Sequence, residues 1–264
     1  MDSMPNGTVR SEVDEGVATV LLDRPDTMNS MNNEFMDDLR TAVERAGADE
    51  RVGVVVITGA GRGFCSGADL SAVDPEHADG DETVRGMDDH FNPTMRAIKA
   101  CQVPTIARVN GAAAGGGLGL ALACDVAIAA RSAFFVATFG PRLGIVPDLG
   151  STWSLPVRAG HARAMGMAML GDRIPAERAA DWGLIWKCVD DERLDEEVAA
   201  AAEVLKRTSG EAMQRIRSSI DTAPNRTFSE QLDLERDHQR VLIPMNMSEG
   251  ASAFMAKREP DFKT

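Results

Sequence analysis

The sequence predicts an α/β fold with a mainly parallel sheet and a helical C-terminal third. Three short apolar runs, at residues 52–58, 105–109 and 125–130, are continuous rather than alternating, which is typical of strands buried on both faces. Segments with helical periodicity separate these runs, and strands that alternate with helices form βα units around a parallel sheet. After about residue 157 the strand signals become rare, so helices are expected there.

The N-terminal segment predicts a β-hairpin followed by a helix. Residues 8–13 and 17–22 are β-prone and flank the turn-like pair Glu15-Gly16. Asn32 or Asn33 can cap the helix, and Gly47 can end it. The apolar residues that follow at helical spacing are Phe35, Leu39, Val43 and Ala46.

The middle of the chain predicts an acidic loop that enters a helix. Residues 71–90 hold seven acidic residues and few large apolar ones. Helical spacing continues through Ile98, and a kink or restart near Asn92 is expected because Pro93 lies inside the pattern. Further helices are expected at residues 194–206, 227–241 and 248–257. We expect a body at residues 1–198 and a helical C-terminal region at residues 199–264.

The composition is that of a soluble globular chain, and it excludes several functions. The 264 residues suffice for one large domain or two small ones, and 44% are hydrophobic and 26% charged. The formal net charge of −13 repels nucleic acid and anionic lipid, so we expect neither nucleic acid nor a membrane as a partner. Because tyrosine is absent, no mechanism can use a tyrosine acid, base or nucleophile.

The cysteines and the N-terminus indicate a reducing compartment. The four cysteines form no CxxC pair, so buried thiols are expected rather than a metal site. The N-terminus has no apolar signal region, and residues 111–124 are too few and too glycine-rich to span a bilayer. We therefore expect a cytoplasmic protein. His77 and His90 lie in the acidic stretch, where exposure is expected and no role is assigned.

Two glycine clusters each follow a predicted buried strand: TGAGRGFCSG at residues 58–67 and GAAAGGGLG at residues 111–119. Glycine between a strand and a helix lets the backbone approach a ligand and directs free N–H groups at it. If Ala68 and one glycine of 115–117 each start a helix beside one pocket, their N–H groups can form an oxyanion hole for an enolate. Tight turns alone would also need glycines. A dinucleotide loop fits poorly, because the first cluster lacks the last glycine of the GxGxxG spacing.

Several stretches carry a family resemblance: LDRPDTMNSMN at residues 22–32, VVVITGAGRGFCSGADL at 54–70, PTIARVNGAAAGGGLGLALACDVAIAA at 104–130, LGIVPDLGSTWSLP at 143–156 and FMAKREPDF at 254–262. In this order and spacing the chain resembles the enoyl-CoA hydratase/isomerase family, also called the crotonase family. The resemblance implies a crotonase-like ββα spiral with a helical C-terminal trimerisation region. It also implies a homo-oligomer, either a trimer or a hexamer.

The resemblance further implies an acyl-CoA substrate whose thioester oxygen lies between two backbone N–H groups. By position these N–H groups belong to Ala68 and Gly116. Coenzyme A enters as part of the substrate, and no separate cofactor is implied. Asp26 stands where relatives often carry a basic residue, and Asp69 is expected to hold N–H groups of its own turn. By the same resemblance the residues that bind substrate and coenzyme A are Arg24, Asp26, Met28, Ser66, Gly67, Ala68, Asp69, Leu70, Phe254 and Lys257.

Departures from the family pattern bear on the chemistry. Hydratases of the family use two glutamates to hold and activate water, and this chain has Gly119 and Gly140 at those positions. Asp148, in VPDLGSTW, remains and resembles the carboxylate of the isomerase branch. There it would take a proton from C2 of a 3-enoyl thioester and return it at C4. Met31 and Trp153 are candidate apolar walls for such a site.

Three functions remain open from the sequence. The first is a 3,2-enoyl-CoA or dienoyl-CoA isomerase with Asp148 as its single base, whose pKa an apolar pocket would raise. The second is an enoyl-CoA hydratase of fatty-acid β-oxidation that uses another acid/base pair, for which Glu34, Asp88 and Asp89 are candidates. The third is a protein that binds a CoA thioester without turnover. Asp148 could also cap a helix that starts near Ser151.

Overall fold

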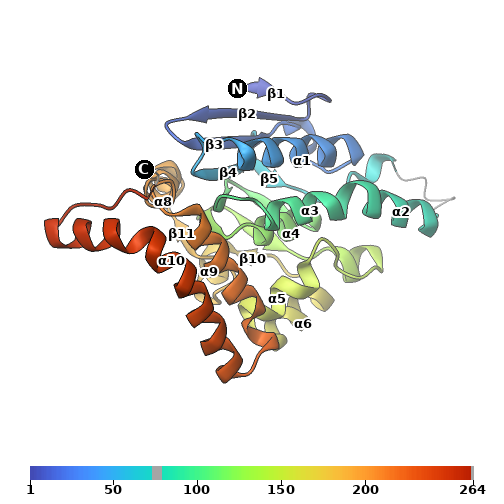
Figure 1. The fold of residues 1–264 in the computed structure, drawn as a ribbon. Coiled ribbons are helices and arrows are strands. Elements are labelled where there is room, and N and C mark those ends of the chain that lie inside the picture. Colours follow the sequence, from blue (N-terminus) through green and yellow to red (C-terminus); the bar gives the residue numbers. More distant parts are fainter. Residues whose placement is uncertain (73–78, 263–264) are drawn as a thin grey trace.

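Strands and helices alternate along the chain in a computed structural model that describes residues 1–72 and 79–262 (Figure 1). Two sheets are present, with the strand orders β1-β2-β3-β4-β6-β8-β11 and β10-β9-β7-β5. The strands of the larger sheet are β1 (Asp2–Ser3), β2 (Val9–Asp14), β3 (Val17–Leu22), β4 (Val54–Gly59), β6 (Thr105–Val109), β8 (Val126–Ala130) and β11 (Lys187–Val189). The strands of the smaller sheet are β5 (Gly63–Cys65), β7 (Ala112–Ala114), β9 (Phe134–Val136) and β10 (Ile174–Pro175).

Each ββα repeat contributes one strand to each sheet. The strands β4, β6 and β8 are neighbours in the larger sheet, and each is followed by β5, β7 or β9 of the smaller sheet. All four pairings within these two sets are parallel, so the chain advances by one strand in each sheet with every repeat. The predicted α/β class and ββα spiral are therefore confirmed. The predicted N-terminal hairpin of β2 and β3 is also confirmed, with both turn residues, Glu15 and Gly16, at positive φ.

Helices cover both sheets and extend the C-terminal end of the chain. They are α1 (Asn33–Ala48), α2 (Gly80–Gly86), α3 (Asn92–Lys99), α4 (Gly116–Ala123), α5 (Ser151–Ala159), α6 (His161–Leu170), α7 (Ala176–Asp181), α8 (Leu194–Leu205), α9 (Gly210–Thr222) and α10 (Phe228–Ala256). Asn32 caps α1, since its side chain accepts a hydrogen bond from the Phe35 N–H group. The helix continues one residue past Gly47, its predicted end. The helix α4 is buried along its whole length, which explains its uniformly apolar sequence GGLGLALA.

The acidic stretch leads into a helix as predicted, although residues 73–78, with His77, lie outside the described residues. A π-helical segment, Met87–Phe91, joins α2 to α3. The predicted restart at Asn92 is wrong, because Phe91 and Asn92 keep right-handed helical backbone angles and the helix continues from the π-helical segment into α3, with Pro93 in the first turn of α3. The prediction that His90 is exposed is wrong. Its side chain is half-buried, with Nδ1 2.9 Å from an Asp37 carboxylate oxygen.

The C-terminal third is helical, but its last two predicted helices are one. Residues 242–247 continue α10 even though Pro244 interrupts its hydrogen-bond ladder. This helix packs against α9 and extends away from the sheets (Figure 1). The predicted boundary at residue 198 lies inside α8, and the division into two regions stays a prediction.

Three of the four cysteines are the buried thiols that the sequence predicts, and Cys188 is partly buried. Burial raises the pKa of the Cys65 and Cys124 thiols to about 12. Within residues 1–72 and 79–262, no helix is long and apolar enough to cross a membrane. No cluster of histidine, cysteine and acidic residues able to hold a metal ion occurs in the same part of the chain.

Candidate active site

The first glycine cluster is tied to residues 24–31 by the buried side chain of Asn29. Its Nδ2 donates to the carbonyl oxygens of Ala60, Gly63 and Phe64 at 3.0, 2.9 and 3.1 Å. Its Oδ1 accepts the N–H group of Arg24 at 2.9 Å. Asn29 has a φ of 58°, a left-handed conformation that asparagine adopts more readily than most residues. One side chain thus fixes the turn after β4 against the loop after β3.

A parallel β-bridge between Met31 and Ala68 orients the first predicted N–H donor. The Met31 N–H group donates to the Gly67 carbonyl, and the Asp69 N–H group donates to the Met31 carbonyl, both at 2.8 Å. Met31 therefore bonds to Gly67 and Asp69, the two neighbours of Ala68, and not to Ala68 itself. In a parallel pairing of this kind the N–H group of Ala68 points away from Met31. The prediction that Ala68 starts a helix is wrong, because bridge pairing holds it extended and the next helical turn begins at Leu70.

The second predicted donor, Gly116, is the first residue of α4, as expected. The N–H group of such a residue has no partner inside its helix. The two glycine clusters touch, since a Cβ atom added to Gly67 would lie 3.0 Å from the Gly116 nitrogen and 2.8 Å from the Ala114 oxygen. In the described part of the chain, the N–H groups of Ala68 and Gly116 have no hydrogen-bond partner. The free N–H groups of Ala68 and Gly116 therefore both lie next to the close contact between Gly67 and Gly116.

Apolar side chains close in on Gly116 from two directions. A Cβ atom at Gly116 would lie 3.0 Å from Met31 Sδ and 2.8 Å from Leu149 Cδ1, so any larger residue there would displace one of these two side chains. Met31 is thus close to the predicted site as expected. Trp153 lies farther out; it is 45% exposed and lies beneath the Lys99 ammonium, which is 5.5 Å from the centre of its ring.

The positions of the two family glutamates are closed by backbone. A Cβ atom at Gly119 would lie 2.7 Å from the Leu149 carbonyl oxygen and 3.1 Å from Ser151 Oγ. A Cβ atom at Gly140 would lie 2.9 Å from the Ala168 carbonyl oxygen. Gly140 belongs to a π-helical segment, Phe139–Leu143, whose turn holds one residue more than an α-helical turn. Neither position could receive a carboxylate without a shift of the neighbouring chain.

Asp148 lies directly before the turn that closes Gly119. It is half-buried, and burial raises the pKa of its carboxyl above the ordinary value. No cation pairs with this carboxyl in the described residues. The helix-cap interpretation is wrong, because Gly150 caps α5 and Asp148 contributes only its backbone carbonyl, which accepts the Ser151 N–H group at 2.9 Å. The carboxyl is therefore available for another role.

The N-terminal members of the predicted coenzyme A site lie together. Arg24 forms an ion pair of 2.8 Å with Asp69, whose carboxylate also accepts the Ser71 N–H and hydroxyl groups. Hydrogen bonds from Ser71 and Arg24 lower the pKa of Asp69 to about 2, so Asp69 holds its turn as predicted. The Ser66 N–H group donates to the Met28 carbonyl at 3.0 Å, which joins the two segments.

The other predicted binding residues lie at the surface. Asp26 and Leu70 are exposed at the edges of this group. Phe254 is 85% exposed near the end of α10, and Lys257 is the exposed cap that follows it. Among the described residues, no hydrogen bond or ion pair joins Phe254 or Lys257 to Arg24 or Ser66. The structure of one chain thus shows no bond that ties them to the site.

The alternative acids are also exposed. Glu34 lies in the first turn of α1, and Asp88 and Asp89 lie on the π-helical segment before α3. None of these three carboxylates has a hydrogen-bond or ion-pair partner in the described residues of the glycine clusters. They give no support to a second acid/base pair.

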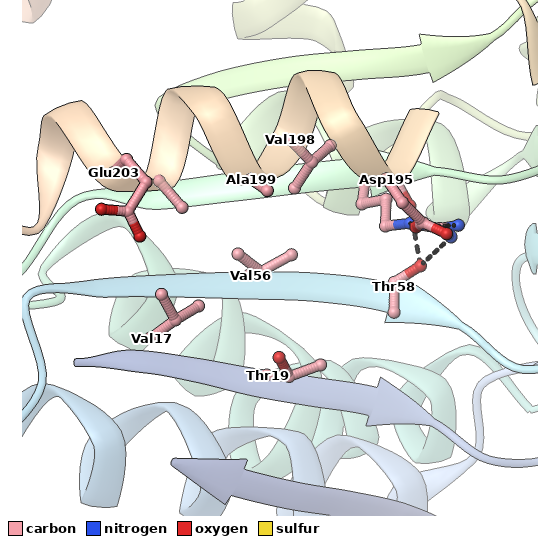
Figure 2. A pocket seen from close by; sticks show the side chains of 10 residues that line it. Val17, Thr19, Val56, Thr58, Asp195, Val198, Ala199 and Glu203 are labelled. Atoms are coloured by element: carbon pink, nitrogen blue, oxygen red, sulfur yellow. Dashed lines mark hydrogen bonds and ion pairs between the residues drawn. The ribbon is translucent and has the colours of Figure 1, made fainter. Parts of the chain in front are cut away.

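A separate cavity of about 360 Å³ lies between α8 and the larger sheet (Figure 2). Val56 and Thr58 of β4 face Val198 of α8 across it. Asp195, at one end, forms an ion pair of 2.7 Å with Arg108. No predicted site residue is found among its described lining residues, so this cavity is distinct from the candidate active site.

Leu149 and Asn29 are the residues of this site that sequence reasoning missed. Leu149 has a φ of 49°, unusual for a residue with a branched side chain, and the only signal in the sequence is its position between Asp148 and Gly150. Asn29 could be found from its place in the turn after a strand, where asparagine tolerates positive φ.

Comparisons with known proteins agree with this geometry. The sequence model of the enoyl-CoA hydratase/isomerase family matches residues 12–264. The 1,2-epoxyphenylacetyl-CoA isomerase of Escherichia coli is 43% identical over 257 residues, which cover 96% of this chain and 97% of the relative. A probable enoyl-CoA hydratase of Rhodobacter capsulatus is 41% identical over 256 residues, with 97% of each chain covered. The crystal structure of an enoyl-CoA hydratase from Bacillus anthracis has a TM-score of 0.88 at 29% identity, covering 97% of this chain and 99% of that one.

The chain belongs to the enoyl-CoA hydratase/isomerase family and is an acyl-CoA enzyme of that family.

Proposed function

We propose that the protein is a 3,2-enoyl-CoA isomerase, or a closely related dienoyl-CoA isomerase, with Asp148 as its single base. The N–H groups of Ala68 and Gly116 hold the thioester oxygen and stabilise the enolate that forms. Asp148 takes a proton from C2 of the 3-enoyl thioester, the double bond moves to C2–C3, and Asp148 returns the proton at C4. The reaction needs one base and two backbone donors, and coenzyme A enters as part of the substrate.

The closed position at Gly119 is the observation that carries this proposal. A hydratase of this family needs two carboxylates to hold and activate water, whereas backbone and side-chain atoms of Leu149 and Ser151 occupy the space beside Gly119. Asp148 is half-buried, unpaired and adjacent to that space, and a carboxyl with a raised pKa is better suited to proton transfer near neutral pH. The Escherichia coli relative, named as an isomerase of 1,2-epoxyphenylacetyl-CoA, supports the same class of reaction.

Hydration is the alternative, and the name of the Rhodobacter capsulatus relative favours it. Incubation of enzyme and thioester in ¹⁸O-labelled water separates the two reactions, because only hydration places the label in the product. A CoA-thioester-binding protein without turnover would show neither reaction.

A paired assay on purified protein tests the proposal. One reaction contains 3-hexenoyl-CoA and the other crotonyl-CoA, and the absorbance of the 2-enoyl thioester is followed in both. We expect a rise in the first and no fall in the second. The Asp148→Asn variant should lose about 10²–10⁴-fold in rate, whereas Asp172→Asn, at an exposed position, should retain the wild-type rate. Rapid loss of crotonyl-CoA, or full activity of Asp148→Asn, would contradict the proposal.

We further propose that the protein forms a homo-oligomer, a trimer or hexamer, through α9 and α10. Large apolar side chains on these helices are exposed in the single chain, and exposed apolar surface is often covered by association. They include Ile216, Ile220, Phe228, Leu232, Met245 and Met247. Light scattering after size-exclusion chromatography should give a mass three or six times that of the chain, and a monomer at micromolar concentration would refute this. A cytoplasmic location stays a prediction.

A further inference from the structure

A second cavity, of about 290 Å³, is lined in part by Leu149, the residue whose side chain also lies against Gly116. Its walls come from α3, the end of α4, the turn before α5, and α5 itself. The apolar part is formed by Met95, Ala123, Leu149 and Trp153. A cavity of this size is at the lower end of the range that holds a small ligand, so it suits part of a substrate.

The rim of this cavity is polar. Lys99 of α3 forms an ion pair of 2.7 Å with Asp221 of α9, and the same ammonium lies 5.5 Å from the centre of the Trp153 ring. Both charged side chains are about one-third exposed, whereas Met95, Ala123 and Leu149 are buried and Trp153 is partly open to solvent. An apolar group that entered past Leu149 would therefore contact Met95 and Ala123 as well as the charged pair Lys99 and Asp221.

Leu149 contacts both this cavity and the surroundings of Gly116. Its Cδ1 lies 2.8 Å from the place of a Cβ atom on Gly116, and the same residue lines the cavity. Met31, the other wall of Gly116, does not belong to the described lining of the cavity. Leu149 is held in the left-handed region, at a φ of 49°, which a leucine rarely adopts. Its position is thus set by the turn between Asp148 and α5.

We propose that Leu149 determines the length of acyl chain that the site accepts, and that this cavity receives the distal part of a longer acyl group once the Leu149 side chain no longer blocks it. The inference rests on the proposed acyl-CoA site at Ala68 and Gly116. A short acyl chain ends against Leu149. A longer chain reaches Met95, Ala123 and Trp153 only when the Leu149 side chain is removed or displaced.

Binding of saturated acyl-CoAs tests the proposal without any turnover. Dissociation constants for butanoyl-, hexanoyl-, octanoyl- and decanoyl-CoA are measured by calorimetry with wild-type protein, Leu149→Ala and Leu155→Ala. Leu155 is a buried leucine of α5 that is not among the described lining residues of the cavity, so it controls for general destabilisation. Each methylene that enters the cavity should strengthen binding about fourfold. We expect the preference for decanoyl-CoA over hexanoyl-CoA to rise at least about tenfold in Leu149→Ala and to stay at the wild-type ratio in Leu155→Ala.

Two further variants keep the test decisive. Leu149→Gly suits the positive φ and replaces Leu149→Ala if that variant does not fold. Ala123→Leu, added to the Leu149 variant, fills the cavity from its other wall and should abolish the gain. An unchanged ratio in folded Leu149 variants would overturn the proposal. If wild-type protein binds these thioesters but does not isomerise 3-hexenoyl-CoA, the proposed reaction is refuted, and the preference for decanoyl-CoA over hexanoyl-CoA still decides the role of Leu149. If no thioester binds, the proposed reaction and the role of Leu149 are both refuted.

Discussion

Replacement of Gly119 by alanine tests whether the chain itself closes the position of the first family glutamate. The new Cβ atom would lie 2.7 Å from the Leu149 carbonyl oxygen, 3.0 Å from Leu149 Cβ and 3.1 Å from Ser151 Oγ. A backbone oxygen cannot rotate away as the end of a flexible side chain can, so the turn after Asp148 must shift. Overpacking of this kind costs about 1–3 kcal/mol of unfolding free energy.

Gly166 provides a matched control, because it also lies inside a helix, α6, and a Cβ atom there would meet nothing within 4 Å. Alanine in a helix interior is more favourable than glycine by about 1 kcal/mol. Gly166→Ala should therefore be about 1 kcal/mol more stable than wild type. Gly119→Ala offsets the same gain with the clash and should be about 1–3 kcal/mol less stable than Gly166→Ala.

Urea unfolding followed by tryptophan fluorescence measures this difference, and the isomerase assay accompanies it. Because the forced shift of Leu149 also displaces Asp148, we expect Gly119→Ala to lose at least about tenfold in rate, since small misplacements of reacting groups are costly. Gly166→Ala should keep its rate. Equal stability and equal activity of the two variants would refute the packing at Gly119, and with it the main support for a single-base reaction. If the Gly119→Glu variant hydrated crotonyl-CoA, that result would also refute the packing at Gly119.

Three further outcomes are expected. The raised pKa of Asp148 means that the folded protein binds this proton more tightly than the unfolded chain. Its contribution to stability is present below pH 3.8 and is lost as pH rises, so Asp148→Asn should melt at a higher temperature than wild type at pH 7, and the acid limb of the wild-type rate should lie above pH 3.8. Arg217→Met should lower the unfolding free energy in urea by about 2–4 kcal/mol, because it leaves the largely buried Asp125 carboxylate without its 2.6 Å partner. Cys65 and Cys124, with thiol pKa values of about 12 from burial, should not react with a disulfide reagent at pH 8 until the protein is denatured, and a fast reaction of either would show that the body opens readily.

Local signals in the sequence predicted the elements that depend on local chemistry. Continuous apolar runs identified the buried parallel strands, with β6 predicted to the residue and β8 to within one. Asn32 identified the start of α1 because an amide oxygen satisfies a free N–H group at a helix start. The continuity of α10 was not predictable in the same way. Pro244 is a strong breaker in isolation, and its neighbours maintain the helix on both sides.

The candidate site was predictable at positions where a second backbone segment lies so close that only glycine can be accommodated. Gly67 and Gly119 each exclude a side chain because a backbone carbonyl oxygen lies less than 3 Å from the place of a Cβ atom, and the family resemblance assigned both positions a role. The pairing of Ala68 with Met31 was missed because it joins residues far apart in sequence through a single bridge. The positive φ of Leu149 was missed for a related reason, since a leucine in that conformation is stabilised by tertiary packing and carries no local signal.

The two unpartnered donors of this enzyme, at Ala68 and Gly116, belong to the main chain. Alanine-scanning mutagenesis would leave both N–H donors in place, so it would measure only the effect of the side chains around them. Replacement of an amide by an ester during chemical synthesis would delete one donor at a time. In the proposed mechanism, substitutions around the donors can change which proton moves, or whether water attacks, while the oxygen of the thioester keeps the same two partners. Descendants of one ancestor can thus diverge in reaction without rebuilding the part that binds the enolate.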